Sequence, residues 1–153
     1  MTRSVLLNII LILVAAIVGV LAYKLSPRLY QNAELTLALS TCDLGKQGCT
    51  AQLPDGGQLE LSIEPRPIRP LQTLHLVAQI TGSYADKIEI DFEGSTMKMG
   101  FNRPVLVGRD GQFSGQTILP VCITGPMEWV ATVLITKGSR RVAIPFRFAV
   151  TAR

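Results

Sequence analysis

A chain of 153 residues with a formal net charge of +4 is long enough for one folded domain and is only mildly basic. Its basic residues are scattered rather than interleaved with aromatic residues along a stripe, which argues against nucleic-acid binding. The single histidine, His75, excludes a His₃ or His₂-carboxylate zinc site and a His₂Cys copper site within the chain. With no glycine-rich phosphate loop and no Ser-His-Asp arrangement in the sequence, we do not expect an enzyme.

Residues 5–23 form an almost purely apolar run in which Asn8 is the one strongly polar side chain. As a helix this run reaches roughly 28 Å, close to the thickness of a bilayer's hydrocarbon core, and Tyr23 lies where an interfacial aromatic residue belongs. The alternative is a cleaved signal peptide, which needs a shorter apolar region and a small-x-small cleavage site that Lys24 disfavours. We therefore expect a transmembrane anchor, with residues 1–4 in the cytoplasm.

Residues 24–50 are predicted to form a juxtamembrane tether, with Pro27 ending the anchor helix or closely following its end. Cys42 and Cys49 flank a glycine-containing turn in this tether. In an oxidising compartment the pair predicts a local disulfide that leaves Cys122 as a thiol. The charges beside the apolar run do not fix the orientation, but a disulfide favours a domain outside the cytoplasm. We expect a single-pass protein of the bacterial inner membrane with its C-terminal domain in the periplasm.

Residues 51–153 alternate apolar and polar side chains with a period of two, which indicates β-strands. The clearest strands are expected at 58–64, 74–80, 88–92, 129–136 and 142–150. Short strands separated by Gly- and Pro-rich turns predict an all-β fold, an immunoglobulin-like antiparallel β-sandwich of about seven strands. A barrel of similar strand content is the alternative.

Two groups of soft side chains stand out in this domain. Met97 and Met99 are two residues apart between two strands, so their sulfur atoms can point the same way. Cys122 and Met127 follow in the loop before the penultimate strand. Thioethers and thiolates suit Cu(I), so the four residues form a candidate copper site if both loops lie at the same end of the domain. Alternatively, the methionines are flexible core fillers and Cys122 is a small buried hydrophobe.

Residues following the methionine pair suggest a second, non-metal function. Phe101, Asn102, Arg103 and Trp129 are predicted to form a docking surface for a membrane or periplasmic protein partner, within or near the 97–104 loop. A scaffold module of this kind is the alternative to copper binding. A thiol-redox accessory role for the three cysteines is a further alternative.

From about residue 87 to residue 150 the chain resembles the YtkA-like domain family and its FixH-type relatives. The matching segments are Met97-Lys98-Met99-Gly100, Asp110-Gly111-Gln112-Phe113-Ser114-Gly115, Gly125-Pro126-Met127-Glu128-Trp129 and Phe146-Arg147-Phe148-Ala149-Val150. The resemblance implies a periplasmic immunoglobulin-like module linked to copper handling or cytochrome oxidase assembly. Copper-associated members offer more Met and His than this chain, which keeps a pure scaffold role open. We expect a membrane-anchored accessory protein that binds Cu(I) transiently.

Overall fold

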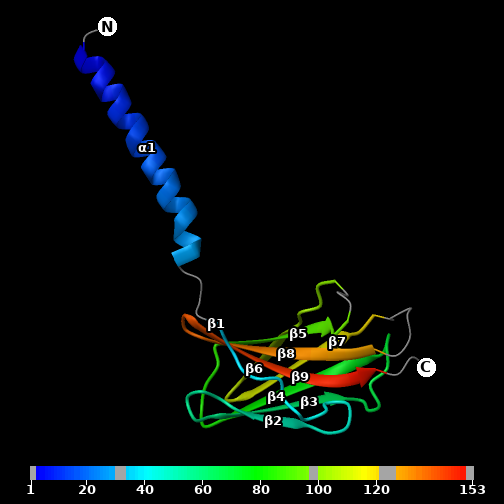
Figure 1. Cartoon of the computed structure of the whole chain (residues 1–153). Coiled ribbons are helices and arrows are strands. Elements are labelled where there is room, and N and C mark those ends of the chain that lie inside the picture. Colours follow the sequence, from blue (N-terminus) through cyan, green and yellow to red (C-terminus); the bar gives the residue numbers. More distant parts are fainter. Residues whose placement is uncertain (1–2, 30–33, 97–99, 121–126, 151–153) are drawn as a thin grey trace. The chain divides into compact units, whose positions relative to one another are not determined.

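The structure is a computed structural model that describes residues 3–29, 34–96, 100–120 and 127–150. Within these residues one helix precedes nine strands (Figure 1). The elements are α1 (Arg3–Leu29), β1 (Glu34–Thr36), β2 (Cys49–Gln52), β3 (Gln58–Glu64), β4 (Thr73–Thr81), β5 (Lys87–Gly94), β6 (Val105–Arg109), β7 (Gln112–Ile118), β8 (Met127–Lys137) and β9 (Arg140–Val150). The chain divides into two compact units, Met1–Asn32 and Ala33–Arg153.

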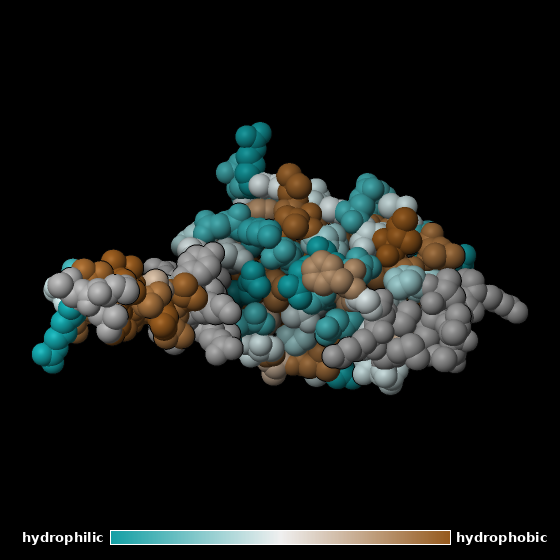
Figure 2. Space-filling model, turned by 90° about the horizontal axis from the view of Figure 1, so that it is seen from above, coloured by the Kyte–Doolittle hydropathy of each residue, from teal (hydrophilic) through white to brown (hydrophobic). Residues whose placement is uncertain are grey.

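The first unit contains α1, whose segment Arg3–Ala22 is long and apolar enough to cross a membrane. Hydrophobic side chains cover much of its described surface (Figure 2). The predicted N-terminal apolar helix is therefore confirmed. It ends at Leu29, two residues beyond Pro27, so the proline does not end it. A proline removes its own N–H donor and clashes with the preceding turn, but it does not prevent the next residues from completing the last turn.

The second unit is a single curled sheet with the strand order β1-β9-β8-β5-β6-β7-β4-β3-β2. All neighbours pair antiparallel except β1 and β9, which are parallel. β6 joins the two halves of the sheet, because Val105 and Leu106 pair with β5 whereas its last three residues pair with β7. One hydrophobic core contains side chains from both halves.

Alternation along the strands determines which residues enter this core. In β4 the apolar residues Leu74, Leu76, Ala78 and Ile80 are buried and every residue between them is exposed. The same period of two buries alternate residues of β3, because successive side chains of a strand point to opposite faces. The predicted all-β fold is thus confirmed at the level of strand content.

The β unit begins earlier than the boundary at residue 51 that the sequence suggested, and it has nine strands in its described part rather than about seven. β1 and the first two residues of β2 lie in the segment predicted as a tether. β1 pairs with the start of β9, and Asp43 forms a further parallel bridge with Arg147. The chain from Glu34 onward therefore runs along β9 as part of the folded unit.

The long strands run between two opposite ends of the β unit. We call one the hairpin end, because it contains the β8–β9 turn after Lys137. We call the other the Met127 end, because β8 begins there and β5 finishes opposite Trp129. β8 has eleven residues, and at about 3.3 Å per residue it separates the two ends by roughly 33 Å. β1 starts beside Arg141, near the hairpin end.

Candidate functional site

The chain segments that carry the predicted soft ligands are joined at the Met127 end. Gly94 pairs with Trp129 in the β5–β8 register. The next residue, Ser95, donates a backbone hydrogen bond to the carbonyl oxygen of Glu128 at 2.9 Å. Met97 follows Ser95 by two residues and Met127 immediately precedes Glu128. The two segments therefore leave the sheet at the same end, as a shared ligand site requires.

Of the four predicted ligands, Met97, Met99 and Cys122 lie outside the described residues. Met127 is the first residue of β8, where it pairs with Val150 in the last pair of the β8–β9 ladder. It is 6% exposed and belongs to the hydrophobic core. Its thioether therefore faces the margin of the core and is not a ligand for an ion in bulk solvent.

Trp129, which we expected on the docking surface, is 1% exposed and packs in the core instead. It lies two residues after Met127 on the same strand and on the same buried face. Its register partner on β9, Phe148, is also buried. Because the burial alternation of β8 turns the indole inward, the exposed part of the predicted surface consists of the residues before β6.

Phe101 is the most exposed large apolar residue of the β unit's described part, at 83%. The guanidinium of Arg103 lies 5.2 Å from the centre of its ring, which is a cation–π distance. Arg103 in turn forms an ion pair with Asp91 of β5, and this hydrogen-bonded carboxylate raises the pKa of Arg103 above its ordinary value. The Phe101 ring is thus exposed to solvent and packs against the guanidinium of Arg103, which Asp91 holds in place.

Asn102 connects the two halves of the sheet next to Phe101. Its carbonyl oxygen accepts a hydrogen bond from Phe92 N of β5 at 3.0 Å. Its side chain reaches the other half, because Nδ2 donates to the Ile118 carbonyl oxygen at 3.1 Å and Oδ1 accepts from Thr117 Oγ1 at 2.9 Å. Thr117 is buried, so this hydrogen bond satisfies a hydroxyl that has little access to water. Asn102 therefore has a structural role, and its side-chain amide is already engaged in hydrogen bonds within the β unit.

Further exposed apolar side chains follow Phe101 along β6. Val105 is 48% exposed and Val107 is 78% exposed, and alternate residues of an extended strand share a side. Ile118, whose carbonyl oxygen holds Asn102, is 53% exposed. We call these four residues the Phe101 surface. Apolar side chains form separate patches among hydrophilic ones on the face of the β unit seen in Figure 2.

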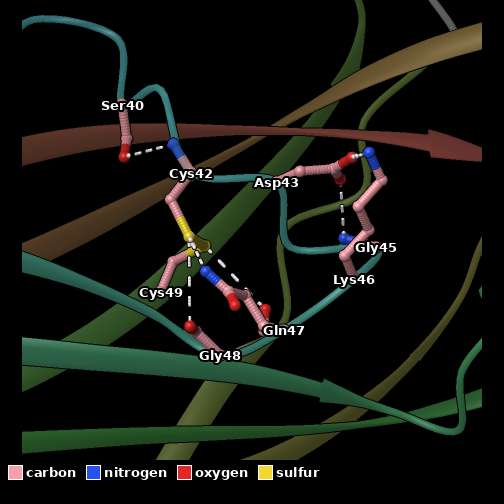
Figure 3. Close-up of a disulfide and its surroundings, with 8 residues drawn as sticks. All are labelled: Ser40, Cys42, Asp43, Gly45, Lys46, Gln47, Gly48 and Cys49. Carbon is pink, nitrogen blue, oxygen red and sulfur yellow. Dashed lines mark hydrogen bonds and ion pairs between the residues drawn. A yellow bond between two sulfur atoms is a disulfide. The ribbon is translucent and has the colours of Figure 1, made fainter.

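Cys42 and Cys49 form a disulfide with a Cα–Cα distance of 5.8 Å, as predicted (Figure 3). The loop between them is held by local hydrogen bonds, including one from Gly45 N to Asp43 Oδ1 at 2.9 Å. Leu44 within the loop is completely buried and donates its N–H to the Arg147 carbonyl oxygen. Cys49 is completely buried. These contacts indicate a structural role for the disulfide. Thiol exchange requires access to the attacked sulfur atom, and Cys49 is buried.

A polar cluster at the hairpin end was not anticipated from the sequence. Lys137 Nζ lies 2.5 Å from Asp55 Oδ2 and 2.5 Å from Ser83 Oγ, and Ser83 Oγ donates to the same carboxylate oxygen at 2.6 Å. Hydrogen bonds from Lys137 and then from Ser83 hold the pKa of Asp55 well below its ordinary value. The Tyr84 ring centre lies 5.9 Å from the ammonium group. The one signal was that Asp55 and Lys137 both belong to glycine-containing turns.

His75 is exposed on β4, and its Nδ1 lies 3.3 Å from Nε2 of Gln116. Groups of three or more His, Cys, Asp or Glu side chains that could hold a metal ion do not occur among the described residues. A Cu(I) site built on thioethers uses a different donor set. No family model matches this chain, and no curated protein is significantly similar to it.

Proposed function

We propose that this chain is a membrane-anchored periplasmic accessory protein that binds Cu(I) transiently, in copper handling or cytochrome oxidase assembly. Met97, Met99, Cys122 and Met127 would hold the ion. The observation that carries the proposal is the hydrogen bond between Ser95 N and Glu128 O, which brings the two ligand-bearing segments to one end of the β unit.

The chemistry of these four side chains supports Cu(I) rather than another cargo. Thioether and thiolate sulfur atoms are soft donors that favour Cu(I), and they are poor ligands for hard cations such as Mg²⁺ or Ca²⁺. The disulfide consumes Cys42 and Cys49, which leaves Cys122 as the chain's one remaining cysteine. Since Met127 faces the margin of the core, an ion that it binds would lie against apolar side chains and away from water. A low-dielectric surrounding of this kind favours a monovalent ion over a divalent one.

X-ray absorption at the copper edge tests the ligand set directly. We expect the Cu(I)-loaded full chain to give a first coordination shell made of sulfur alone, and we expect Met97→Ala/Met99→Ala to lower the number of sulfur neighbours. Arg140→Met adds a thioether to β9 at the opposite, hairpin end and is the matched control, for which the spectrum stays unchanged. A shell of nitrogen or oxygen donors would contradict the proposal.

An interaction module that docks on a protein partner through the Phe101 surface is a second candidate function. The favouring observation is the exposure of Phe101, which is 83% and is combined with a supporting cation and a fixed backbone. Exposed aromatic residues are frequent anchors at protein interfaces, where burial of one ring contributes a large share of the binding free energy. Phe101 itself lies toward the Met127 end, because the next residue bonds Phe92, which pairs with Ala131 of β8, whereas Val105 and Val107 extend the surface toward the hairpin end.

Photo-crosslinking in cells separates this candidate from the first. A benzophenone amino acid at Phe101 is expected to give one discrete adduct with a partner protein, whereas the same residue at Tyr84, an exposed aromatic position at the hairpin end, gives none at that mass. The reverse pattern, or identical adducts at both positions, would contradict docking through the Phe101 surface.

The proposed location is supported by α1 and by the disulfide. A helix with an apolar segment of twenty residues has the length of a transmembrane span. Disulfides form and persist in oxidising compartments such as the periplasm. We expect the chain to resist alkaline carbonate extraction from the inner membrane and to be digested by protease in spheroplasts. Release by carbonate, or protection in intact spheroplasts, would contradict this location.

We also propose an immunoglobulin-like classification for the β unit. In such folds the second strand lies beside the fifth, and the third, sixth and seventh strands are neighbours on the other sheet. Here β4 lies between β3 and β7, while β5, β8 and β9 are consecutive neighbours. This strand order supports a Greek-key sandwich in which β6 bridges the two layers.

A further inference from the structure

A cleft of about 660 Å³ opens at the hairpin end, roughly the length of β8 away from Met127. It is lined by residues of β1, of the turn before β3, of the β4–β5 connection and of the β8–β9 hairpin. The lining residues that matter for its chemistry are Leu35, Asp55, Tyr84, Lys137, Arg140 and Arg141.

The cleft carries a net positive charge. Three cations and one carboxylate line it, which leaves a formal charge of +2. Lys137 is neutralised by Asp55, so the excess belongs to Arg140 and Arg141. Arg140 is exposed and makes no ion pair with a described residue. Arg141 lies 3.7 Å from Glu89 through one nitrogen, and its Nε is buried with no hydrogen-bond partner among the described residues. Adjacent arginines with unused donors are suited to phosphate.

The same cleft also offers apolar surface beside the arginines. Leu35 is 50% exposed and the Tyr84 ring is 64% exposed. A purely aqueous anion would leave these side chains in water. A headgroup phosphate joined to a glycerol backbone would contact the arginines with its charged part and the apolar side chains with its carbon-rich part.

Few residues of the sequence separate the cleft from the proposed anchor. Leu35 lies six residues after Leu29, the last residue of α1. Six fully extended residues span at most about 21 Å. The stretch of chain that joins the proposed anchor to this wall of the cleft is therefore short.

We propose that this cleft binds the phosphate of an anionic phospholipid headgroup, and that it thereby turns the hairpin end toward the membrane. The inference rests on the membrane anchoring of the proposed function. With the hairpin end turned to the lipid, the Met127 end, with Met127 and the nearby Phe101 ring, faces away from the membrane and toward a partner.

Native mass spectrometry of the full chain, released from uncharged detergent micelles that contain added lipid, tests the proposal. We expect the wild type to retain phosphatidylglycerol in preference to phosphatidylcholine. Each arginine near a membrane surface contributes about fivefold to such a preference. Arg140→Gln should therefore lower it about fivefold and Arg140→Gln/Arg141→Gln about 25-fold.

Arg147→Gln is the matched control, since Arg147 shares a face of β9 with Arg141 but lies near the Met127 end. It should leave the preference unchanged. An equal preference in all variants would overturn the proposal. If the double variant does not fold, the single variant Arg140→Gln tests the proposal by itself. The exposed side chain of Arg140 makes no ion pair with a described residue, so its loss should not affect folding.

A second arm separates the lipid from free phosphate. Inorganic phosphate added in large excess over the lipid should displace little phosphatidylglycerol, because it lacks the apolar part of the headgroup. Complete displacement would overturn the lipid assignment in favour of a free-phosphate site. The micelle experiment does not require the chain to be anchored in cells, so carbonate extraction of the chain would contradict the anchoring while the lipid result stands by itself.

Discussion

Ser95 N donates a hydrogen bond to Glu128 O at 2.9 Å, and this contact joins two segments that are more than thirty residues apart in the sequence. It continues the β5–β8 ladder one step beyond Gly94. As a result, the two segments that contain Met97 and Met127 leave the sheet side by side. The candidate copper site depends on this pairing, since four soft ligands that are divided between two loops bind one ion only when the loops are neighbours.

Truncation to alanine should change the stability of the β unit little at Phe101 and strongly at Trp129. Phe101→Ala removes a ring that is 83% exposed, and we expect the free energy of unfolding to change by no more than about 0.5 kcal/mol. Trp129→Ala empties a fully packed position and should cost about 3–5 kcal/mol. Urea unfolding of the two variants checks this. Equal losses would mean that the Phe101 ring is packed, and the docking surface would then have no anchor.

Asn102→Ala should destabilise the β unit by about 1–3 kcal/mol, although the residue is only half buried. The substitution leaves the buried Thr117 hydroxyl and the Ile118 carbonyl oxygen without their partner. The control is a double-mutant cycle with Thr117→Val, which removes the same hydrogen bond from the other side. We expect the two losses to be clearly less than additive, and strict additivity in urea unfolding would refute the link between the two halves of the sheet.

Loss of the disulfide should destabilise the β unit by about 2–3 kcal/mol. Cys42 and Cys49 close a short loop with a sequence separation of 7, and the chain-entropy relation gives a value of this size for so short a loop. Guanidinium unfolding of the oxidised wild type and of Cys42→Ser/Cys49→Ser measures the difference. Reductant should lower the stability of the wild type to that of the variant and leave the variant unchanged. A reductant effect on the variant would point to a different bond.

Asp55 should make stability depend on pH on the acid side. Its folded-state pKa is lowered by hydrogen bonds from Lys137 and Ser83. The carboxylate therefore contributes stability fully at pH values above its unfolded-state pKa of about 3.9, and this contribution is lost as the pH falls from there toward the folded-state pKa. The difference in Tm between the wild type and Asp55→Asn should be constant from pH 7 to about pH 5 and should shrink below about pH 4. A constant difference down to pH 2 would contradict the ion pair.

Alternation of apolar and polar side chains was enough to predict the strands that carry most of the core. In β4 and β3 every second residue is apolar, so one face is identified without knowledge of the fold. The disulfide was predictable for a related reason, because a short loop with two glycines lets the flanking cysteines meet.

The strands at the edges of the sheet were not predictable in this way. β1 has three residues, too few for a period to be recognised, and all three are exposed; it is a strand because of its pairing with β9 more than one hundred residues later. The Lys137–Asp55 ion pair spans 82 residues and has no local signal. The inward position of Trp129 follows from the register of β8, which an aromatic residue beside a loop does not reveal by itself.

The most direct test of the central claim is an anaerobic titration of the full chain with Cu(I) in competition with a strong chelator. We expect the wild type to withdraw one equivalent of Cu(I) per chain. Met97→Ala/Met99→Ala and Cys122→Ser remove proposed ligands. Each should therefore weaken Cu(I) binding by more than the roughly 10- to 100-fold that is typical when a residue that only supports a metal ligand is replaced. Cys42→Ser/Cys49→Ser is the control and should bind as the wild type does. No competition by the wild type, or unchanged competition by the methionine variant, would contradict the proposed copper site.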